Sequence, residues 1–423
     1  MALTKVSGGL LGNLSVGTDN VALGNTALDS LTSGQENVAI GSASLTAVTS
    51  GQRNVGVGVS TLQTISTANF NTALGHAAAR DITGSGNTAL GDTAMVTATT
   101  GDNNTAVGHQ SLKVNTASNN TAVGKDALTA NTTGANNTGV GSSALIANTS
   151  GAQNTAVGAG ALDAASTSNY NTALGYAALT ACEASNNTAI GWQSLDASTS
   201  GSDNVAVGYD SGSSVTSGYA NTILGYLAGA YQNSITTGSD NVVIGAFART
   251  SSATVSNEIA IGRYVLGQGA NTATLGISGN GVSIAINGST TTWTAHSDER
   301  LKKNIETSTA GLDFIKDLRP ITYQWKNKNE ISSEFVNYYD ADSEQTVHGD
   351  KDHTYHGFIA QEVKEVIDNH PEIKNGQSMW REGPDGIQHL GDSAFIPMLV
   401  NAVKELSAKC DSLQSEINIL KGE

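Results

Sequence analysis

The apolar and polar positions of residues 13–256 recur with a short, regular period. Each unit reads Gly-x-x-Asn-Thr-Ala-Val/Leu-Gly-x-x-Ala-Leu and is followed by a stretch rich in Thr, Ser and Asn. The Asn of the unit recurs from Asn20 to Asn241, and a degenerate last copy has Glu258 in its place. Successive copies lie 16 or 17 residues apart, except for one step of 20. Self-similarity at so short a period is typical of a solenoid.

The chemistry of the unit favours strands over helices. Asn-Thr-Ala-Val is a short run bounded by turn-forming residues, and a closing glycine such as Gly158 permits a positive φ or a close backbone approach. An Ala-Leu pair such as Ala127-Leu128 would point one large apolar side chain inward in each turn. Stacked Asn side chains can form hydrogen-bonded ladders. We therefore predict a mainly β fold, with a β-roll shaft over residues 13–256.

The predicted core of this shaft is thin. One or two aliphatic residues per turn would bury little apolar surface in a single chain, which favours several chains that share one core. Over residues 13–262 the pattern resembles the left-handed β-rolls of trimeric autotransporter adhesin heads and similar repeats in bacteriophage tail fibres. The resemblance implies a parallel homotrimer, with three rolls packed around one axis.

The segments before and after the repeats differ from them in sequence. Residues 297–423 contain all four prolines and a much higher density of charge, so we expect a second domain there. Residues 257–296 lose the strict period and alternate Thr and Ser with apolar residues, which predicts a β-rich neck. Residues 1–12 precede the repeats, and we expect them to be a short attachment segment that docks on a virion tail or adaptor protein.

Charge and composition exclude several classes of protein. The chain carries 21 Lys and Arg against 37 Asp and Glu, a net charge of −16. It lacks the basic surface that nucleic-acid binding requires, so we expect no nucleic-acid partner. No apolar run approaches the ~20 residues of a membrane span, and the first residues do not resemble a secretory signal. Two cysteines, Cys182 and Cys410, cannot form a disulfide framework, which is typical of a protein made in a reducing compartment.

The repeats offer few candidates for chemistry. Their acidic residues are scattered singly, whereas glycosidase chemistry needs two carboxylates held ~5–10 Å apart. We interpret these acids as solubilising surface charges. Aromatic and His side chains follow the closing glycine in several repeats, and decoration of the outer face is favoured over glycan contact. They are His76, His109, Tyr176, Trp192, Tyr209 and Tyr226.

The start of the second domain contains a Ser five residues before a Lys, at Ser297 and Lys302. A desolvated, neutral lysine amine can act as a general base toward a serine hydroxyl. This spacing alone does not establish such a dyad, because a Ser that caps a helix, with solvated basic residues behind it, has the same pattern.

Four motifs in a fixed order make the assignment more specific. Together they resemble the intramolecular chaperone domain of endosialidases and other phage tail spikes and fibres, which is also found in myelin regulatory factor. The resemblance spans residues 297–423. The motifs are Ser-Asp-x-Arg-x-Lys-x-x-Ile at 297–305, Leu-Arg-Pro-Ile-Thr-Tyr-Gln-Trp at 318–325, Gly-Phe-Ile-Ala-Gln-Glu-Val at 357–363 and Phe-Ile-Pro-Met-Leu-Val at 395–400.

This resemblance implies a folding helper that trimerises and then releases itself by cutting its own chain before the motif Ser. The cut would fall between His296 and Ser297, with Ser297 as the nucleophile and Lys302 as its base. Lys303 is a rival base by proximity, but Lys302 matches the motif position.

Two further residues match the first motif, Asp298 and Arg300. By the same resemblance they would fix the geometry of the cleavage site through an ion pair or a cap. We expect no cofactor and no metal.

The end of the chain carries a heptad pattern. Apolar residues at spacings of three and four continue from Ile396 to Leu420, which predicts a helical oligomer. Heptads do not fix the number of helices, but a trimeric coiled coil would match the shaft. A single amphipathic helix packed on its own domain is the alternative. The seam residues are Ile396, Leu399, Val403, Leu406, Cys410, Leu413, Ile417 and Leu420. A second helix is expected over residues 361–369, ending before Pro371.

A polar insert contains a cluster that could hold a metal, although we favour no metal there because the insert is generally rich in Asp, Glu and Tyr. The cluster comprises His348, Asp350, Asp352, His353 and His356. The sequence as a whole predicts a phage tail fibre, a virion appendage made in the bacterial cytoplasm, that attaches to a receptor on the host cell surface. The alternatives are a tailspike that depolymerises glycan and a bacterial trimeric surface adhesin.

Overall fold

The computed structural model describes residues 19–278, 280–287, 294–295, 297, 299–334, 339–348, 352–373, 379–383 and 386–422. The chain divides into two compact units, Met1–Ser297 and Asp298–Glu423. The segment predicted to attach to a virion, residues 1–12, lies outside the described residues.

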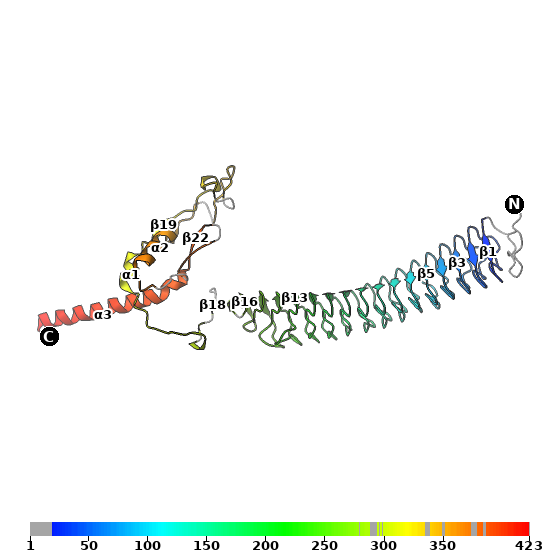
Figure 1. Ribbon diagram of the computed structural model, residues 1–423, viewed down its shortest axis with the longest axis horizontal. Coiled ribbons are helices and arrows are strands. Elements are labelled where there is room, and N and C mark those ends of the chain that lie inside the picture. Colours follow the sequence, from blue (N-terminus) through cyan, green and yellow to red (C-terminus); the bar gives the residue numbers. More distant parts are fainter. Residues whose placement is uncertain are drawn as a thin grey trace. The chain divides into compact units, whose positions relative to one another are not determined.

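The first unit is a β-solenoid of about fifteen turns, with one short strand in each turn (Figure 1). Strands β1 to β16 pair in parallel, each with the strand of the next turn. The strands are β1 (Val21–Leu23), β2 (Val38–Ile40), β3 (Val55–Val57), β4 (Thr72–Leu74), β5 (Thr88–Leu90), β6 (Thr105–Val107), β7 (Thr121–Val123), β8 (Thr138–Val140), β9 (Thr155–Val157), β10 (Thr172–Leu174), β11 (Thr188–Ile190), β12 (Val205–Val207), β13 (Thr222–Leu224), β14 (Val242–Ile244), β15 (Glu258–Ile261) and β16 (Thr272–Ile277). The predicted mainly β solenoid fold is confirmed.

The core of the solenoid is closed within one chain. The middle residue of most strands is a buried Ala, and the Leu of each Ala-Leu pair packs against it, as at Leu128, Leu145 and Leu162, all 0% exposed. The core residues are therefore buried without a second chain, so the thin core alone does not require several chains. Small Ala side chains let the two sides of each turn approach closely enough for a single Leu to fill the space between them.

The strands also have an outer face, and it is apolar. The third residue of each strand from β1 to β14, and the last residue of β15, is Leu, Ile or Val. These side chains point away from the core, and Leu74, Leu90 and Leu174 are 40–46% exposed. A strand face turned only to water usually alternates apolar with polar residues, so this row is an unusual surface for a solvated shaft.

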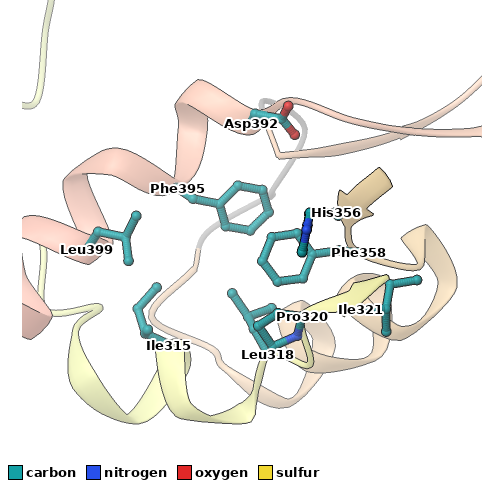
Figure 2. A pocket seen from close by; sticks show the side chains of 10 residues that line it. Ile315, Leu318, Pro320, Ile321, His356, Phe358, Asp392, Phe395 and Leu399 are labelled. Carbon is teal, nitrogen blue, oxygen red and sulfur yellow. The ribbon is translucent and has the colours of Figure 1, made fainter. Parts of the chain in front are cut away.

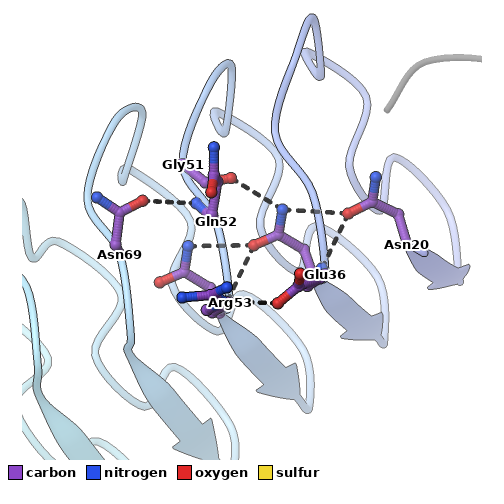
Figure 3. A network of polar contacts seen from close by, with 8 residues as sticks. Asn20, Glu36, Gly51, Gln52, Arg53 and Asn69 are labelled. Carbon is purple, nitrogen blue, oxygen red and sulfur yellow. Dashed lines mark hydrogen bonds and ion pairs between the residues drawn. The ribbon is translucent and has the colours of Figure 1, made fainter. Parts of the chain in front are cut away.

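Asparagine side chains form a continuous ladder along the solenoid (Figure 3). Asn37 donates its backbone N–H to Oδ1 of Asn20 at 2.9 Å, and its side-chain amide donates to the Gly51 carbonyl, also at 2.9 Å. The same pair of bonds recurs at Asn54 with Asn37 and with the carbonyl of Ala68. The ladder predicted from the sequence is confirmed, and it satisfies buried backbone groups that no strand would reach.

We expect Asn154→Ala to destabilise the solenoid by about 2–4 kcal/mol. Asn154 accepts the N–H of Asn171 at 3.0 Å and donates to the Ser168 carbonyl at 2.8 Å, so the substitution leaves two buried groups without these partners. Urea unfolding followed by circular dichroism would measure the loss. Asn25→Ala, at an exposed position, is the control and should change stability by less than ~0.5 kcal/mol. Equal effects of the two substitutions would contradict the stabilising role of the ladder.

The closing glycines are required by both backbone conformation and crowding. Gly158 has a φ of 145°, and a Cβ at this position would lie 2.2 Å from the carbonyl oxygen of Gly175 in the next turn. Even alanine would therefore force neighbouring turns apart. The positive φ and close approach predicted for these corners are confirmed.

The parallel ladder ends at β16. Strand β16 pairs with the antiparallel strand β17 (Asn280–Ala285), which pairs with the short strand β18 (Thr294–Ala295). Glu258 closes the asparagine ladder: its N–H donates to Asn241, and its buried carboxylate accepts the N–H groups of Ser251 and Gly269 at 2.9 and 2.6 Å. The degenerate last copy of the repeat is thus the end cap of the ladder.

The second unit is a small α+β domain. Its helices are α1 (Leu312–Asp317), α2 (Ala360–Asn369) and α3 (Ile396–Lys421), with short 3-10 helices η1 (Glu299–Leu301), η2 (Lys328–Glu330) and η3 (Asp392–Phe395). Strand β19 (Ile321–Tyr323) pairs antiparallel with β20 (Tyr355–Gly357), and β21 (Trp380–Glu382) with β22 (Gln388–Leu390). Phe314 of α1, Val363 and Ile367 of α2 and Phe395 of η3 form its core. The helix predicted before Pro371 is confirmed as α2.

Candidate functional site

The predicted cleavage motif begins in irregular chain and continues into a short helix. Ser297 is exposed and lies outside regular secondary structure, and η1 begins two residues later, at Glu299. The N–H of Lys302 donates to the Glu299 carbonyl at 2.9 Å, which closes this helical turn. The side chains of Arg300 and Lys302 are exposed. His296 and Asp298 lie outside the described residues, so the assigned roles of all five residues stay predictions.

Three of the sequence motifs meet at one apolar hollow of about 470 Å³ (Figure 2). The 318–325 motif contributes Leu318, Pro320 and Ile321, the 357–363 motif contributes Phe358, and the 395–400 motif contributes Phe395 and Leu399. The rings of Phe358 and Phe395 stack with their centroids 5.8 Å apart. These motifs therefore build one structural junction next to the start of α3.

A bidentate ion pair joins two of these motifs. The guanidinium of Arg319 donates to both carboxylate oxygens of Glu362, through Nε at 2.9 Å and through Nη2. The hydrogen bonds and charge of Arg319 lower the pKa of the Glu362 carboxyl. The pair joins the residue before Pro320 to the first turn of α2 through two parallel hydrogen bonds.

His370 connects α1 with the end of α2. Its Nε2 lies 2.9 Å from Oδ2 of Asp317, its Nδ1 lies 2.7 Å from Oε1 of Glu372, and its ring packs edge-on against Phe314. Hydrogen bonds to Asp317 and then to Glu372 raise the pKa of His370 above its usual value of 6.5. The hydrogen bond from His370 lowers the pKa of Glu372.

We expect these shifts to make the domain's stability depend on pH. Because the pKa of His370 is raised in the folded state, its contribution to the free energy of unfolding is complete below about pH 6.5. That contribution is lost as the pH rises through the folded-state pKa. Glu372 has the opposite pH dependence: its stabilising contribution is lost as the pH falls through its lowered pKa. Urea unfolding of wild type and His370→Gln should therefore differ most in mildly acidic solution and converge at higher pH. A constant difference would contradict the charged His370 network.

The heptad seam on α3 is exposed along its whole length. Exposure of the seam side chains runs from 43% for Ile417 to 86% for Leu420, and Cys410 is exposed as well. The helix does pack on its own domain, but through Met398, Asn401 and Ala402, which lie on another face. Most of the seam is therefore left uncovered by its own domain, apart from Leu399, which lines the hollow, and its pairing with other helices stays a prediction.

Two polar residues of α3 were not predicted from the sequence. The Asn401 side chain donates to the carbonyls of Ser308 and Ala310, both at 3.0 Å, and Glu405 accepts the N–H of Leu312 at 3.1 Å. Their spacing of four residues on a helix, off the seam, was the available signal. It did not reveal which distant segment they would contact.

The aromatic residues of the shaft form a stack along its outer surface. Trp192 and Tyr209 lie with their ring centroids 4.8 Å apart and nearly parallel, and Tyr209 and Tyr226 lie 5.2 Å apart. The ring faces therefore contact one another, and mainly the ring edges remain open. This arrangement supports outer-face decoration over a platform on which sugars stack.

Neither a membrane span nor a metal cluster is evident where the structure is described. None of the helices there combines the length and apolar character needed to cross a bilayer. Within the same residues, no group of three or more His, Cys, Asp or Glu side chains is arranged to hold a metal ion. Asp350 of the polar insert lies outside the described residues.

Comparison with known families finds one match, over part of the C-terminal unit. Residues 297–370 match the family model described as the chaperone of endosialidase, Peptidase_S74. Searches of curated proteins and of solved structures found no match to the chain. The match covers the motifs at 297–305, 318–325 and 357–363, and it confirms that part of the resemblance. Residues 297–370 of this chain, which follow its β-solenoid, are therefore similar to the endosialidase chaperone.

Proposed function

We propose that this protein is a phage tail fibre, a virion appendage for host attachment, whose C-terminal domain drives trimerisation and then releases itself. The observation that carries the proposal is the match of residues 297–370 to the endosialidase chaperone family in a chain whose other unit is a long β-solenoid. A fibrous shaft with a folding domain at one end fits an assembly that must be made once and then persist outside a cell.

The proposed release is a peptide-bond cleavage between His296 and Ser297. The Ser297 hydroxyl attacks the carbonyl carbon of His296 while the Lys302 amine takes the hydroxyl proton. The bond from that carbon to the Ser297 nitrogen breaks, and the departing amine receives the proton. Water then hydrolyses the resulting ester, which leaves a carboxylate on His296 and a free amino group on Ser297.

Assembly would control this reaction. A lysine acts as a base only when its amine is neutral, and removal from water favours the neutral form. The Lys302 side chain is exposed in the single chain. We infer that neighbouring chains cover it, so that an unassembled chain stays intact and a correctly assembled one is cut.

Two apolar surfaces support assembly of several copies. The first is the exposed seam of α3, and the second is the aliphatic row on the outer face of the solenoid strands. Ile or Val at the a positions with Leu at the d positions is also common in two-stranded coils. The number three therefore rests on the chaperone family and on the resemblance of the repeats to trimeric β-rolls.

Cleavage after assembly would make the fibre persistent. Pairing between chains is slow and prone to errors of register, and a domain that joins the chains early raises their effective concentration. Once that domain has been released, the low-energy path by which the shaft could unfold would be lost, and the shaft would be kinetically stable.

Native mass spectrometry of the uncut Ser297→Ala chain tests the assembly. The proposal expects three times the chain mass of 43.1 kDa. Mild oxidation should then link Cys410 of neighbouring chains, because a positions of parallel, in-register helices lie close to the common axis. Cys182 is buried, and Cys410→Ser is the control. A monomer would contradict the proposal, and a dimer would contradict the trimeric fibre.

A second candidate function is depolymerisation of glycan by the shaft, and one observation favours it. Burial raises the pKa values of Asp196 and Asp210, and the charge of Asp210 raises that of Asp196 further. Trp192 and Tyr209 lie close to them in the chain. Release of reducing sugar from host polysaccharide by the purified shaft, lost in Asp196→Asn, would establish this activity. No release by the wild-type shaft would leave the attachment role alone.

A further inference from the structure

The chain that carries the predicted cleavage motif is fastened to α3. Asn401 donates both side-chain hydrogen bonds to this chain, at the Ser308 and Ala310 carbonyls. One turn further along α3, Glu405 accepts the N–H of Leu312. The contacts thus fix three points of one segment, residues 308–312, on a single helix.

Gly311 lets Glu405 come this close. A Cβ at Gly311 would lie 1.9 Å from Oε1 of Glu405, so no other residue fits here without moving the carboxylate. Gly311 and the preceding Ala310 are both buried. The backbone at residues 310 and 311 is thus covered, while the Glu405 side chain that contacts it is exposed.

The two faces of α3 have different contacts. Asn401 and Glu405 each lie between two seam positions in sequence but on a different face of the helix, in heptad positions f and c when Ile396 is a. The seam remains exposed, while this other face holds the segment 308–312. A helix that joins other chains through its seam therefore moves the segment with it.

The segment is near enough to the motif to control its position. Five residues lie between Lys302 and Ser308, so the two are at most about 20 Å apart along extended chain. The residues between them include Ile305, which is 61% exposed. Fixing residue 308 on α3 thus confines Lys302 to a limited region around the helix that would assemble.

We propose that Asn401 and Glu405 are positioning residues that couple assembly of α3 to self-cleavage, by holding residues 308–312 and so delivering the Lys302 segment to the assembled helices. This inference rests on the proposed self-cleaving function. Neither residue touches the reacting atoms; both act through the backbone that they hold.

Cell-free synthesis of the full chain tests the coupling. Cleavage is followed on denaturing gels, and assembly is followed by chemical cross-linking of the same samples. We expect Asn401→Asp, which removes both donated bonds at nearly constant shape, to slow cleavage of assembled chains about tenfold or more. Glu405→Ala should do the same, whereas Glu405→Gln keeps an acceptor oxygen and should restore most of the rate. Lys404→Ala, at an exposed neighbouring position, is the matched control and should cut normally.

A further variant avoids the risk that substitutions at Asn401 and Glu405 disturb folding. Insertion of six Gly and Ser residues after Ile305 leaves Asn401 and Glu405 in place but lengthens the tether, and it should also slow cleavage of assembled chains. Assembled variants that cut at the wild-type rate would overturn the positioning role and leave self-cleavage intact. An assembled wild-type chain that is never cut would instead overturn the proposed function, and the coupling with it.

Discussion

Ser297→Ala and Lys302→Ala are expected to remain full-length chains under conditions in which the wild-type chain is cut completely. Loss of a nucleophile or its base commonly lowers catalysis by several orders of magnitude. In a reaction that happens once in each chain, such a loss is seen as absence of product. Denaturing gels of freshly expressed protein would measure it.

Lys303→Ala is the matched control for Lys302→Ala, because it removes a neighbouring amine with the same exposure class. The account expects the Lys303→Ala chain to be cut like wild type. Cleavage that survives Lys302→Ala but fails in Lys303→Ala would show that the base was assigned to the wrong lysine. Cleavage in Ser297→Ala would overturn the assigned nucleophile.

Leu406→Asp combined with Leu413→Asp should abolish assembly and cleavage together. Both residues are more than half exposed in the single chain and lie at d positions of the seam. In a coiled coil, each substitution would place an unpaired charge in an apolar core, at a cost of several kcal/mol in every chain. Light scattering would measure the mass of the assembly, and a denaturing gel would measure cleavage.

Ile419→Asp provides the control for the seam variant. Ile419 is 75% exposed on the same helix but lies off the seam, so the substitution adds a charge where no partner helix is expected. It should assemble and cut like wild type. A seam variant that still cuts as a monomer would separate the two events and contradict control of cleavage by assembly.

The repeating part of the fold was predictable because the same few residues recur in every turn. Asn, Ala, Gly and Leu at fixed positions indicated the ladder, the strand interior, the corner and the core. The backbone of the Leu positions was not predictable: Leu128 and Leu145 have φ values of 52° and 53°, a left-handed conformation that costs about 1–2 kcal/mol in a side-chain-bearing residue. Burial of each Leu and the bond from its N–H to the next turn offset that cost.

The candidate site was predictable only in part, because local patterns are visible in the sequence and long-range contacts are not. The order of motifs indicated the similarity to the endosialidase chaperone, and the heptad spacing predicted α3 and its apolar seam. Contacts between segments far apart in sequence have no local signature, so neither the Arg319–Glu362 pair nor the hold of Asn401 on Ser308 and Ala310 could be predicted. The estimate of a thin core also failed because it counted large side chains and overlooked how closely Ala allows the chain to pack.

The central claim is that the chaperone domain releases itself at one bond, and intact mass spectrometry of freshly expressed full-length protein tests it most directly. The account predicts two fragments, roughly two thirds and one third of 43.1 kDa, with Ser297 as the first residue of the smaller one. A single uncut chain of 43.1 kDa in a fully assembled protein would contradict it.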